Sequence, residues 1–460
     1  MEEKLAVKTL FFIFCPTLFG DLLSSIFSVS VKNIRIFILS LPRFFRCAIE
    51  YQVQKKQKVF IKYLSKSKDC FWIMMKNVSL ILGLVIVCAC TSTDRSFSDG
   101  MEVIPVKVDH PTKDPASFLE KIELVPLETN DSSLTSIGRK VMYDKEDNLL
   151  AILSKSAVYT FTGEGRYIGN SKKRIGQGPQ EYSFVVDMNY NPYLKGIDFL
   201  NPYGTVYTYS PAFEFISQRK FQPESVVNHL MALDADHDIF LPGEFSEVLF
   251  ADRKTRQITP IPYEGTISGG NGLSSQNNLF HIGDDAYFVP SGLNYYLYRI
   301  DAKEKKLVPI IYLDFGKYEV KEEDLPGSAG GKRTDSDEMR RKLSEDVQVR
   351  RKYVKSNCVV PMLKLFSDEY VYVYFVKKNI GMGSHFIYNR KKRKGALLEE
   401  EAPFSMYPGF ALADNVLFAL CEPDWIERVT DRKLMSAEEI RKMEALKEDD
   451  NPVVVKYYLK

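Results

Sequence analysis

Cysteine and histidine are scarce in most of this sequence, and their scarcity argues against the commonest metal sites. Only two of the seven cysteines, Cys358 and Cys421, follow residue 90, and the whole chain has five histidines. No cysteines have the CxxC spacing, and no group of cysteine and histidine has the spacing of a zinc site. We therefore expect no metal and no cofactor. The two late cysteines fit one disulfide or two buried thiols, and we assign no function to them.

A concentrated basic surface is also missing from the main part of the chain. The formal net charge is +2, but residues 1–74 hold 12 Lys and Arg against 5 Asp and Glu, which leaves the remainder mildly acidic. Binding of nucleic-acid phosphates needs clustered Lys and Arg, so we expect no nucleic-acid partner. With 460 residues and 45% hydrophobic content, the chain is long enough and apolar enough for a large globular core.

Residues 75–90 show the order of features of a bacterial lipoprotein signal peptide. Lys76 provides the short, positively charged start of the signal peptide. Residues 78–87 (VSLILGLVIV) provide an apolar stretch that is too short for a stable membrane anchor. Small Ala89 suits the peptidase, and the Cys90 thiol would take a diacylglycerol, so that palmitate-type chains anchor the protein. The alternative is a chance apolar run that ends in cysteine.

The segments on either side of this signal differ in character. The polar stretch that follows it (TSTDRSFSDG) is typical of a flexible stalk. We assign 75–89 to the signal peptide and 90–119 to the lipidated cysteine and its tether. Because a signal peptide works near a true N-terminus, we interpret residues 1–74 as a non-native extension, with translation starting at Met74 or Met75. A membrane segment at residues 9–31, interrupted by Pro16 and Asp21, is the alternative.

From Glu120 onward the sequence is a repeat of short alternating strands separated by turn residues. Five segments each combine a strand, a turn and a second strand: residues 158–168, 206–216, 248–261, 297–310 and 385–398. Their turns open with Thr162, Ser210, Asp252, Asp301 and Asn389. The intervals of 48, 42, 49 and 88 residues indicate a unit of about 45 to 50 residues with one insertion, which is the period of propeller blades.

Two helices interrupt this pattern. A charged insertion at Glu319–Asn357 passes through a Gly-rich loop and predicts a helix over about 335–355. Ser436 and Glu439 have capping-box spacing and predict a second helix over about 436–448. A helix cannot replace a strand without breaking the ladder of a blade, so both are expected to leave from loops at the rim.

The two ends of the repeat complete a sixth blade. The strand KIELVPLE (Lys121–Glu128) opens the repeat and VVVKYYL (Val453–Leu459) ends it. Pairing them closes the ring, removes exposed sheet edges and ties the two ends of the repeat together. The predicted fold is therefore all-β: a six-bladed β-propeller over residues 120–460, closed by N-terminal and C-terminal strands, with two helical insertions. A two-sheet sandwich array, the alternative, would not give a single period along the chain.

Three stretches carry a family resemblance: IELVPLETNDSSLTSIG (Ile122–Gly138), RIGQGPQEY (Arg174–Tyr182) and DNPVVVKYYLK (Asp450–Lys460). With them the chain resembles the 6-bladed β-propeller lipoproteins, a large and mostly uncharacterised group in gut anaerobic bacteria. The resemblance covers residues 120–460 and implies the fold and lipid anchoring, without catalytic residues. The chain departs from the family in its N-terminal extension and in the charged insertion near Gly330.

One loop in these stretches is a candidate ligand site. The GQGP loop lacks the GK[ST] sequence and the following helix of a phosphate-binding loop, so we interpret it as a turn in which Gly176 and Gly178 supply positive φ. Gln177, Glu181 and Tyr182 are the possible ligand contacts, and the last two are alternatively hydrogen-bonding residues between blades.

The remaining candidates are weaker. His229 and His281 precede blade strands near the expected central channel, but their separation of 52 differs from the 48 of the strands that follow, so we assign no metal site. The 26 Tyr and 30 Phe fit core packing better than carbohydrate stacking. The basic run Arg390–Lys394 fits a solvated hairpin turn.

No reaction can be assigned from these residues. We expect a lipid-anchored binding module, a monomer that recognises a glycan, peptide or protein ligand with loops at one face. The alternative is an envelope hydrolase or lyase with its active site at the channel mouth, which would require titratable groups from several blades to converge there. Lipidation implies the cell envelope, most simply the outer membrane, and the residues after Cys90 do not decide between its periplasmic and surface sides.

Overall fold

The computed structural model divides into two units, Met1–Ser96 and Phe97–Lys460, and every residue that it describes belongs to the second. The described residues are 100–112, 114–242, 247–263, 277–290, 293–320, 358–377, 383–399 and 404–460. The signal peptide, Cys90 and the helix predicted at 335–355 lie outside them.

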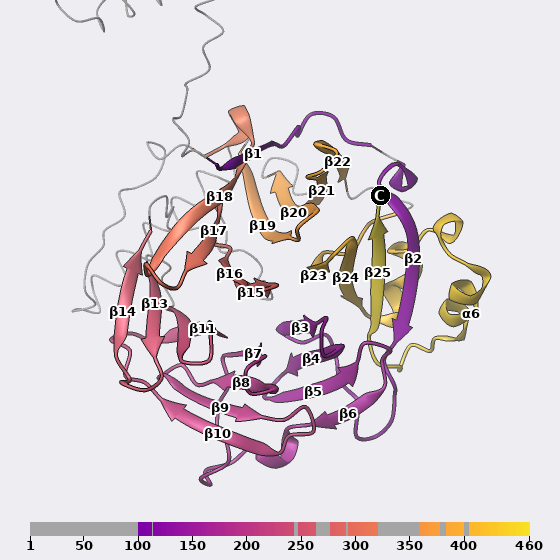
Figure 1. Cartoon of the computed structure of the whole chain (residues 1–460). Coiled ribbons are helices and arrows are strands. Elements are labelled where there is room, and N and C mark those ends of the chain that lie inside the picture. Colours follow the sequence, from indigo (N-terminus) through magenta and orange to yellow (C-terminus); the bar gives the residue numbers. More distant parts are fainter. Residues whose placement is uncertain are drawn as a thin grey trace, which may run out of the picture. The chain divides into compact units, whose positions relative to one another are not determined.

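Six β-sheets are arranged in a ring around a central axis, and each sheet is one blade of a propeller (Figure 1). Blade 1 contains β3 (Lys140–Asp144), β4 (Leu149–Ser154), β5 (Ala157–Thr162) and β6 (Tyr167–Asn170). Blade 2 contains β7 (Asp187–Asn191), β8 (Gly196–Leu200), β9 (Thr205–Tyr209) and β10 (Phe215–Lys220). Blade 3 contains β11 (Val227–Ala232), β12 (His237–Pro242), β13 (Glu247–Asp252) and β14 (Ile258–Pro262).

The second half of the ring repeats this arrangement with additions. Blade 4 contains β15 (Leu279–Ile282), β16 (Asp285–Phe288), β17 (Tyr296–Asp301), β18 (Lys306–Asp314) and β1 (Glu102–Pro105). Blade 5 contains β19 (Val359–Phe366), β20 (Tyr370–Lys377), β21 (Gly383–Asn389) and β22 (Lys394–Glu399). Blade 6 contains β23 (Gly409–Ala413), β24 (Val416–Cys421), β25 (Val453–Leu459) and β2 (Leu119–Pro126).

The five repeated sequence segments are the outer hairpins of blades 1 to 5, as predicted. Each turn-opening side chain accepts a hydrogen bond from a backbone N–H inside its turn; Asp252 Oδ1, for example, accepts from Thr255 N at 2.7 Å. Each turn also has one residue with positive φ, at Gly165, Phe213, Arg256, Lys305 and Arg393. The turn chemistry that made the repeat visible in the sequence therefore fixes the hairpin geometry.

The predicted closure of the ring is confirmed. β2 pairs antiparallel with β25, with Ile122 opposite Tyr457 and Leu124 opposite Val455, and β25 pairs on its other side with β24. Blade 6 therefore draws its outermost strand from the start of the repeat and its other three strands from the end, which ties the two ends of the fold together.

One strand was not expected from the sequence. No strand is predicted before Lys121, yet β1 pairs in parallel with the outer strand β18 of blade 4, with Val103 opposite Tyr312. Part of the segment 90–119, assigned as a tether, is thus integrated into the propeller. Its burial pattern explains the addition, because Ile104, Val106 and Val108 are buried against blades 4 and 5.

Among the residues that the structure describes, helices are few and lie in loops. α6 (Ala437–Ala445) matches the predicted second helix, and Ser436 Oγ accepts the predicted capping bond from Glu439 N. It leaves from the loop between β24 and β25 and packs outside β2 (Figure 1). The other helical turns are short 3₁₀ segments: η1 (Pro115–Ser117), η2 (Lys172–Arg174), η3 (Gly316–Tyr318), η5 (Pro423–Arg428) and η6 (Arg432–Leu434).

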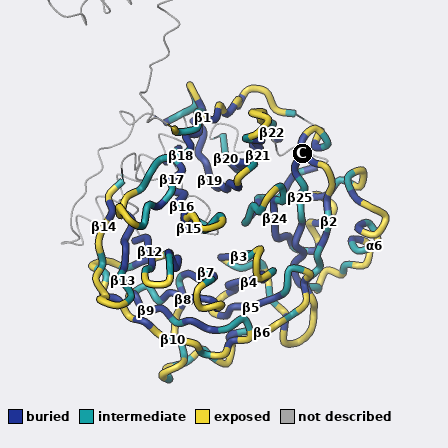
Figure 2. The backbone as a smooth tube through the Cα atoms, in the orientation of Figure 1, coloured by how far each residue is buried: buried dark blue, intermediate teal, exposed yellow. Residues whose placement is uncertain are grey.

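The core consists of apolar layers between neighbouring blades. Buried residues follow the strands around the whole ring, and exposed residues concentrate in the turns (Figure 2). Tyr182, Phe199 and Tyr209 pack edge-on between blades 1 and 2, which is typical of the use of aromatic residues in this core. Cys358 and Cys421 are buried and not joined in a disulfide, and burial raises the pKa of the Cys421 thiol to about 12.

Candidate functional site at the channel mouth

The inner strands of the blades all begin at the same end of the central channel, because each follows a linker from the outer strand of the preceding blade. We call this end the linker mouth, and define it by the starts of β3, β7 and β11 with the loops that lead into them. The opposite end, formed by the turns after the inner strands, we call the turn mouth. The two ends differ in their side chains, as described below.

Three titratable side chains from three consecutive blades converge at the linker mouth. Lys140 begins β3, Asp187 begins β7 and His229 lies near the start of β11. Lys140 Nζ lies 2.5 Å from Asp187 Oδ1, and His229 Nδ1 lies 3.7 Å from Asp187 Oδ2. Leu230 N also donates to Asp187 Oδ2, at 3.0 Å, so both carboxylate oxygens are engaged by the protein.

The electrostatics of this cluster keep Asp187 ionised. Burial of the carboxyl would raise its pKa, but the charges and hydrogen bonds of Lys140 and His229 outweigh burial and lower the pKa to about 2. The side chains of Asp187 and Lys140 are 1% and 5% exposed, whereas that of His229 is 17% exposed. The histidine is therefore the most exposed of the three groups, and its Nδ1 lies on the side of the Asp187 carboxylate.

Amide side chains cross the channel beyond this cluster. Asn277, which precedes blade 4, donates through Nδ2 to Val141 O of blade 1 and to Phe410 O of blade 6, both at 3.2 Å. Asn189 Nδ2 donates to Leu230 O of blade 3 at 3.0 Å. These contacts join inner strands from both sides of the ring, so the channel is crossed by side chains of the protein itself.

An exposed aromatic residue and an arginine lie beside the buried cluster. Arg139 immediately precedes Lys140, its guanidinium donates to Val185 O, and its Cζ lies 5.7 Å from the centre of the Phe184 ring. Partial burial lowers the pKa of Arg139, and the charge of Asp187 opposes this shift. Phe184 is 48% exposed and Tyr203, on the neighbouring loop of blade 2, is 71% exposed. This edge of the mouth offers aromatic surface and a cation to solvent.

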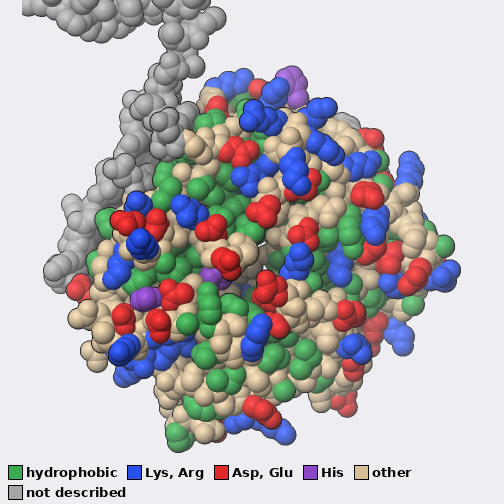
Figure 3. Space-filling view, viewed as in Figure 1, with side chains coloured by type: hydrophobic (Ala, Val, Ile, Leu, Met, Phe, Trp, Pro, Cys, Tyr) green, Lys and Arg blue, Asp and Glu red, His purple; other side chains and the backbone are tan. Residues whose placement is uncertain are grey.

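The turn mouth is rich in acidic residues. Acidic residues occupy or flank the turns after the inner strands of five blades: Asp144, Glu146, Asp147, Asp234, Asp236, Asp284, Asp285, Asp368, Glu369 and Asp414. Burial and the neighbouring Asp147 and Glu146 raise the pKa of Asp144. On the face shown in Figure 3, several Asp and Glu side chains lie around the centre of the ring.

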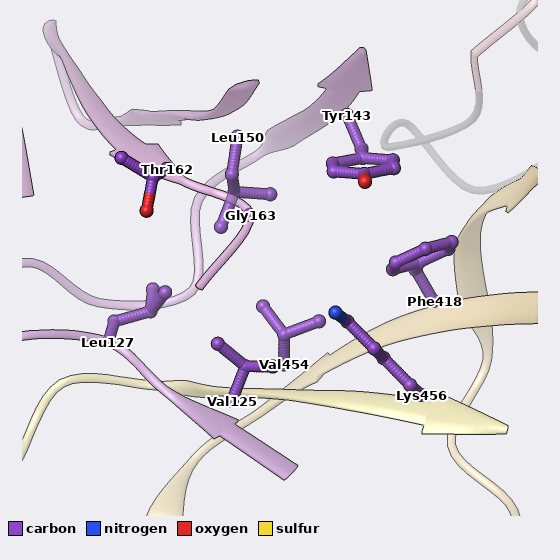
Figure 4. A pocket seen from close by; sticks show the side chains of 9 residues that line it. All are labelled: Val125, Leu127, Tyr143, Leu150, Thr162, Gly163, Phe418, Val454 and Lys456. Atoms are coloured by element: carbon purple, nitrogen blue, oxygen red, sulfur yellow. The ribbon is translucent and has the colours of Figure 1, made fainter. Parts of the chain in front are cut away.

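A shallow pocket lies away from the channel, in the seam between blades 6 and 1. The rings of Tyr143 and Phe418, which line the pocket, stack with their centres 4.4 Å apart. Val125, Leu150 and Lys456 are among the other residues that line it (Figure 4). Lys456 Nζ lies 5.7 Å from the Phe418 ring. The aliphatic stem of the lysine covers the apolar seam, which explains the pocket as a packing gap between two blades.

The GQGP loop folds back on itself. Gly178 N donates to Glu181 Oε2 at 2.9 Å, so a carboxylate of the loop occupies the position that a bound anion would take. Tyr182 is fully buried; its hydroxyl contacts Ser171 Oγ at 2.5 Å and donates to Ser156 O at 3.0 Å. Burial raises the pKa of Tyr182 to about 12. Of the three predicted contacts, Gln177 alone is exposed, and Glu181 is half-buried.

The explanation of the two glycines by positive φ is wrong. Neither Gly176 nor Gly178 has a left-handed backbone; a Cβ on Gly176 would lie 2.0 Å from Glu181 Oε2, and one on Gly178 would lie 3.1 Å away. The glycines instead leave the space in which the Glu181 carboxylate packs. The loop joins blades 1 and 2, since Tyr209 OH donates to Gln180 O at 3.0 Å.

Comparison with known proteins assigns the family. Residues 101–458 match a family described as a domain of unknown function, DUF4934. The chain belongs to the DUF4934 family. Among the curated proteins, no match was found.

Two solved structures illustrate what this DUF4934 chain is similar to. A protein from Bacteroides fragilis, described as a candidate exported protein, superposes with a TM-score of 0.57 at 14% identity, covering 78% of this chain and 99% of the other. The propeller domain of Cps50 (Swd1) from Myceliophthora thermophila superposes with a TM-score of 0.36 at 9% identity, covering 72% of this chain and 99% of the other. At 14% identity the likeness to the Bacteroides fragilis protein concerns the fold alone, and the second likeness is too low to carry an argument.

The histidines singled out in the sequence of this DUF4934 protein have different environments. His281 Nε2 lies 2.8 Å from Ala232 O. His281 is near the end of β15 that is farther from the linker mouth, so it does not share a site with His229. In the described part of the chain, no group of three or more His, Cys, Asp or Glu side chains is placed to hold a metal ion. Among the same residues, no helix is long and apolar enough to cross a membrane.

Sequence reasoning missed Arg139, Lys140 and Asp187. The sequence signal that could have found these residues is their position. Each lies where a linker enters an inner strand, and charged residues at such positions face the channel. The register of the inner strands was not apparent, since the repeat was recognised from the outer hairpins.

Proposed function

We propose that this DUF4934 protein is an exported lipoprotein, attached to the outer membrane through Cys90, that acts as a monomeric binding module. The order of positive head, apolar stretch, Ala89 and cysteine supports export and lipidation. The fold-level likeness to a candidate exported protein of Bacteroides fragilis agrees with a location outside the cytoplasm. The ligand is a glycan, peptide or protein that binds at the linker mouth.

The observation that carries the binding role is the contrast between the interior and the edge of the channel. Inside, polar groups are bonded to the protein, as Asn277 and Asp187 show. At the edge, Phe184 and Tyr203 expose aromatic rings, and the Arg139 guanidinium lies beside Phe184. Exposed rings with a polar rim are typical of recognition surfaces.

A hydrolase or lyase at the same mouth is the second candidate. It is favoured by the convergence of Lys140, Asp187 and His229 from three blades, with a strongly lowered pKa at Asp187. Binding remains the better supported role because the carboxylate is 1% exposed and both of its oxygens are engaged. In the enzyme role His229, the most exposed of the three, is the member of the cluster that would meet a substrate.

A binding screen with the full chain distinguishes the two candidates. We expect saturable binding to a member of a glycan and peptide panel, no change in the ligand over hours, and retention of most of the affinity in His229→Gln. Steady turnover of any polymer that His229→Gln abolishes would replace the binding role with the enzyme.

Lipid attachment has a separate test. Cells that express the full chain and are fed labelled palmitate should label the protein, and Cys90→Ala should remove the label, with Cys88→Ala as the matched control. Equal labelling of the wild type and Cys90→Ala would refute the anchor.

A further inference from the structure

We propose that the ligand of the linker mouth is an anionic oligosaccharide, with a sugar carboxylate on Arg139 and sugar rings on Phe184 and Tyr203. The inference rests on the proposed binding function and specifies its ligand. It follows from three independent features: two neighbouring exposed rings, a guanidinium held beside one of them, and the unequal charge of the two ends of the channel.

The exposed rings are exceptional in this chain. In the described part of the propeller, Tyr and Phe side chains are mainly buried between blades, and the exposed aromatic residues are Phe184, Tyr193, Tyr203 and Trp425. Phe184 and Tyr203 lie on adjacent loops, joined by a hydrogen bond from Asn201 Nδ2 to Phe184 O at 3.5 Å. The C–H face of a sugar ring carries slight positive charge and packs on the negative face of an aromatic ring. Two rings on adjacent loops therefore provide platforms for successive sugars.

The guanidinium of Arg139 is held in place and remains exposed. It donates to Val185 O, and its Cζ lies 5.7 Å from the Phe184 ring. The carboxylate that acts on it electrostatically is Asp187, which is itself bound to Lys140 Nζ at 2.5 Å. An arginine fork matches a carboxylate in two parallel hydrogen bonds, so Arg139 can take the acid group of a uronic-acid unit stacked on Phe184.

The charge distribution favours an anion at this end of the channel. At the starts of the inner strands, Arg139 and Lys140 face the one carboxylate of Asp187, and His229 adds a further cation when it is protonated. The loops that lead into β3, β7 and β11 hold nearly balanced charges: Lys172, Lys173 and Arg174 against Glu128, Asp131, Glu181 and Glu224. The turn mouth, at the other end of the inner strands, carries the acidic residues already described. The turn mouth therefore repels an anionic chain, whereas the linker mouth does not and offers it the cation of Arg139. An acidic peptide shares the charge but has no sugar ring to stack, which makes it the competing outcome.

The test is calorimetric titration of the full chain with trigalacturonate, and with a neutral galactose trisaccharide as the comparison ligand. We expect trigalacturonate to bind at least tenfold more tightly. Arg139→Gln should weaken the binding of trigalacturonate by tenfold or more, because a hydrogen-bonded charge pair contributes roughly that factor. Phe184→Ala, which removes the ring on which the sugar stacks, should weaken the same binding by tenfold or more. Arg139→Lys, which keeps the charge without the fork, should be intermediate.

The chain offers a matched control. Arg428 and Trp425 form a second exposed guanidinium–ring pair, at 4.9 Å, on blade 6. Arg428→Gln and Trp425→Ala should leave the affinity for trigalacturonate unchanged. Equal effects at the two pairs would indicate non-specific attraction and overturn the assignment.

Other outcomes separate this inference from the binding function. Equal affinity for the neutral and anionic trisaccharides would overturn the inference and leave the binding function intact. The same holds if a triglutamate peptide binds as tightly as trigalacturonate and Phe184→Ala does not weaken its binding. If trigalacturonate does not bind while another ligand of the panel does, the anionic-glycan assignment is wrong. If no ligand of the panel binds, both the assignment and the binding function are wrong.

Discussion

At the scale of single residues, two buried lysines show how the partner decides the effect of a charge. Lys140 is paired with Asp187, whereas Lys364, which is fully buried in β19, donates to the carbonyl oxygen of Asn294. Burial alone lowers the pKa of Lys364 to about 7. A buried charge that a carboxylate compensates is tolerated, and one without that compensation is destabilising.

We expect Lys364→Met to raise the free energy of unfolding near neutral pH by a few kcal/mol. Between about pH 7 and the ordinary lysine pKa of 10.5, the unfolded chain holds the proton that the folded chain has released. The stability of the wild type should therefore rise with pH across this window, by up to about 1.4 kcal/mol per pH unit, and stay flat below it. Lys364→Met should lack this rise in urea titrations at several pH values.

Lys140→Met is the matched change at the paired lysine. It leaves the Asp187 carboxylate buried without its cation, so we expect a loss of about 3 kcal/mol. Stabilisation by Lys140→Met, or a pH dependence in Lys364→Met identical to that of the wild type, would contradict this account.

At the scale of elements, the outer strands of two blades are covered by segments that the repeat does not contain. In blade 4, β1 adds a parallel strand to β18. In blade 6, α6 lies outside β2, where Glu439 Oε2 accepts from Leu124 N at 2.5 Å. Lys442 Nζ donates to Leu124 O at 3.5 Å, so side chains of the helix satisfy both backbone groups of an edge residue. Covered edges protect a sheet from pairing with other chains.

Glu439→Ala should therefore lower the free energy of unfolding by about 2 kcal/mol, because the Leu124 N–H loses its acceptor in a buried position. Glu439 is 7% exposed, whereas Glu438, the adjacent residue of the same helix, points to solvent. Glu438→Ala is the control and should change stability by no more than about 0.5 kcal/mol. Equal thermal denaturation midpoints for the two variants would show that α6 does not stabilise the edge.

At the scale of the whole molecule, ring closure depends on one buried amide as well as on strand pairing. Asn451 is fully buried just before β25. Its Nδ2 donates to Glu128 O at 2.7 Å and to Ser133 O at 3.1 Å, and its Oδ1 accepts from Thr135 N at 2.8 Å. These bonds connect the sequence stretches Ile122–Gly138 and Asp450–Lys460, which carry the family resemblance. The two stretches therefore have a structural role, because they hold the two ends of the repeat together.

We expect Asn451→Ala to lower the free energy of unfolding by about 3 kcal/mol, since several buried backbone groups lose their partner. Asn415→Ala, which removes a single side-chain bond to Leu459 O at the other end of β25, should cost about 1 kcal/mol. Chemical denaturation of the full chain measures both. Similar losses for the two variants would show that Asn451 has no special part in closure.

The sequence by itself determined the all-β class, the period, the outer hairpins, the closing strands and α6. Local chemistry carries these features: turn-opening residues such as Asp252 cap their own hairpins, and Ser436 caps its own helix. The tertiary structure alone decided which polar residues meet. Lys140, Asp187 and His229 are more than 40 residues apart from one to the next, and their contact depends on the register and rotation of whole blades. For the same reason the GQGP loop, conspicuous in the sequence, proved to be filled by its own Glu181, while Arg139 and Phe184 became neighbours at the mouth.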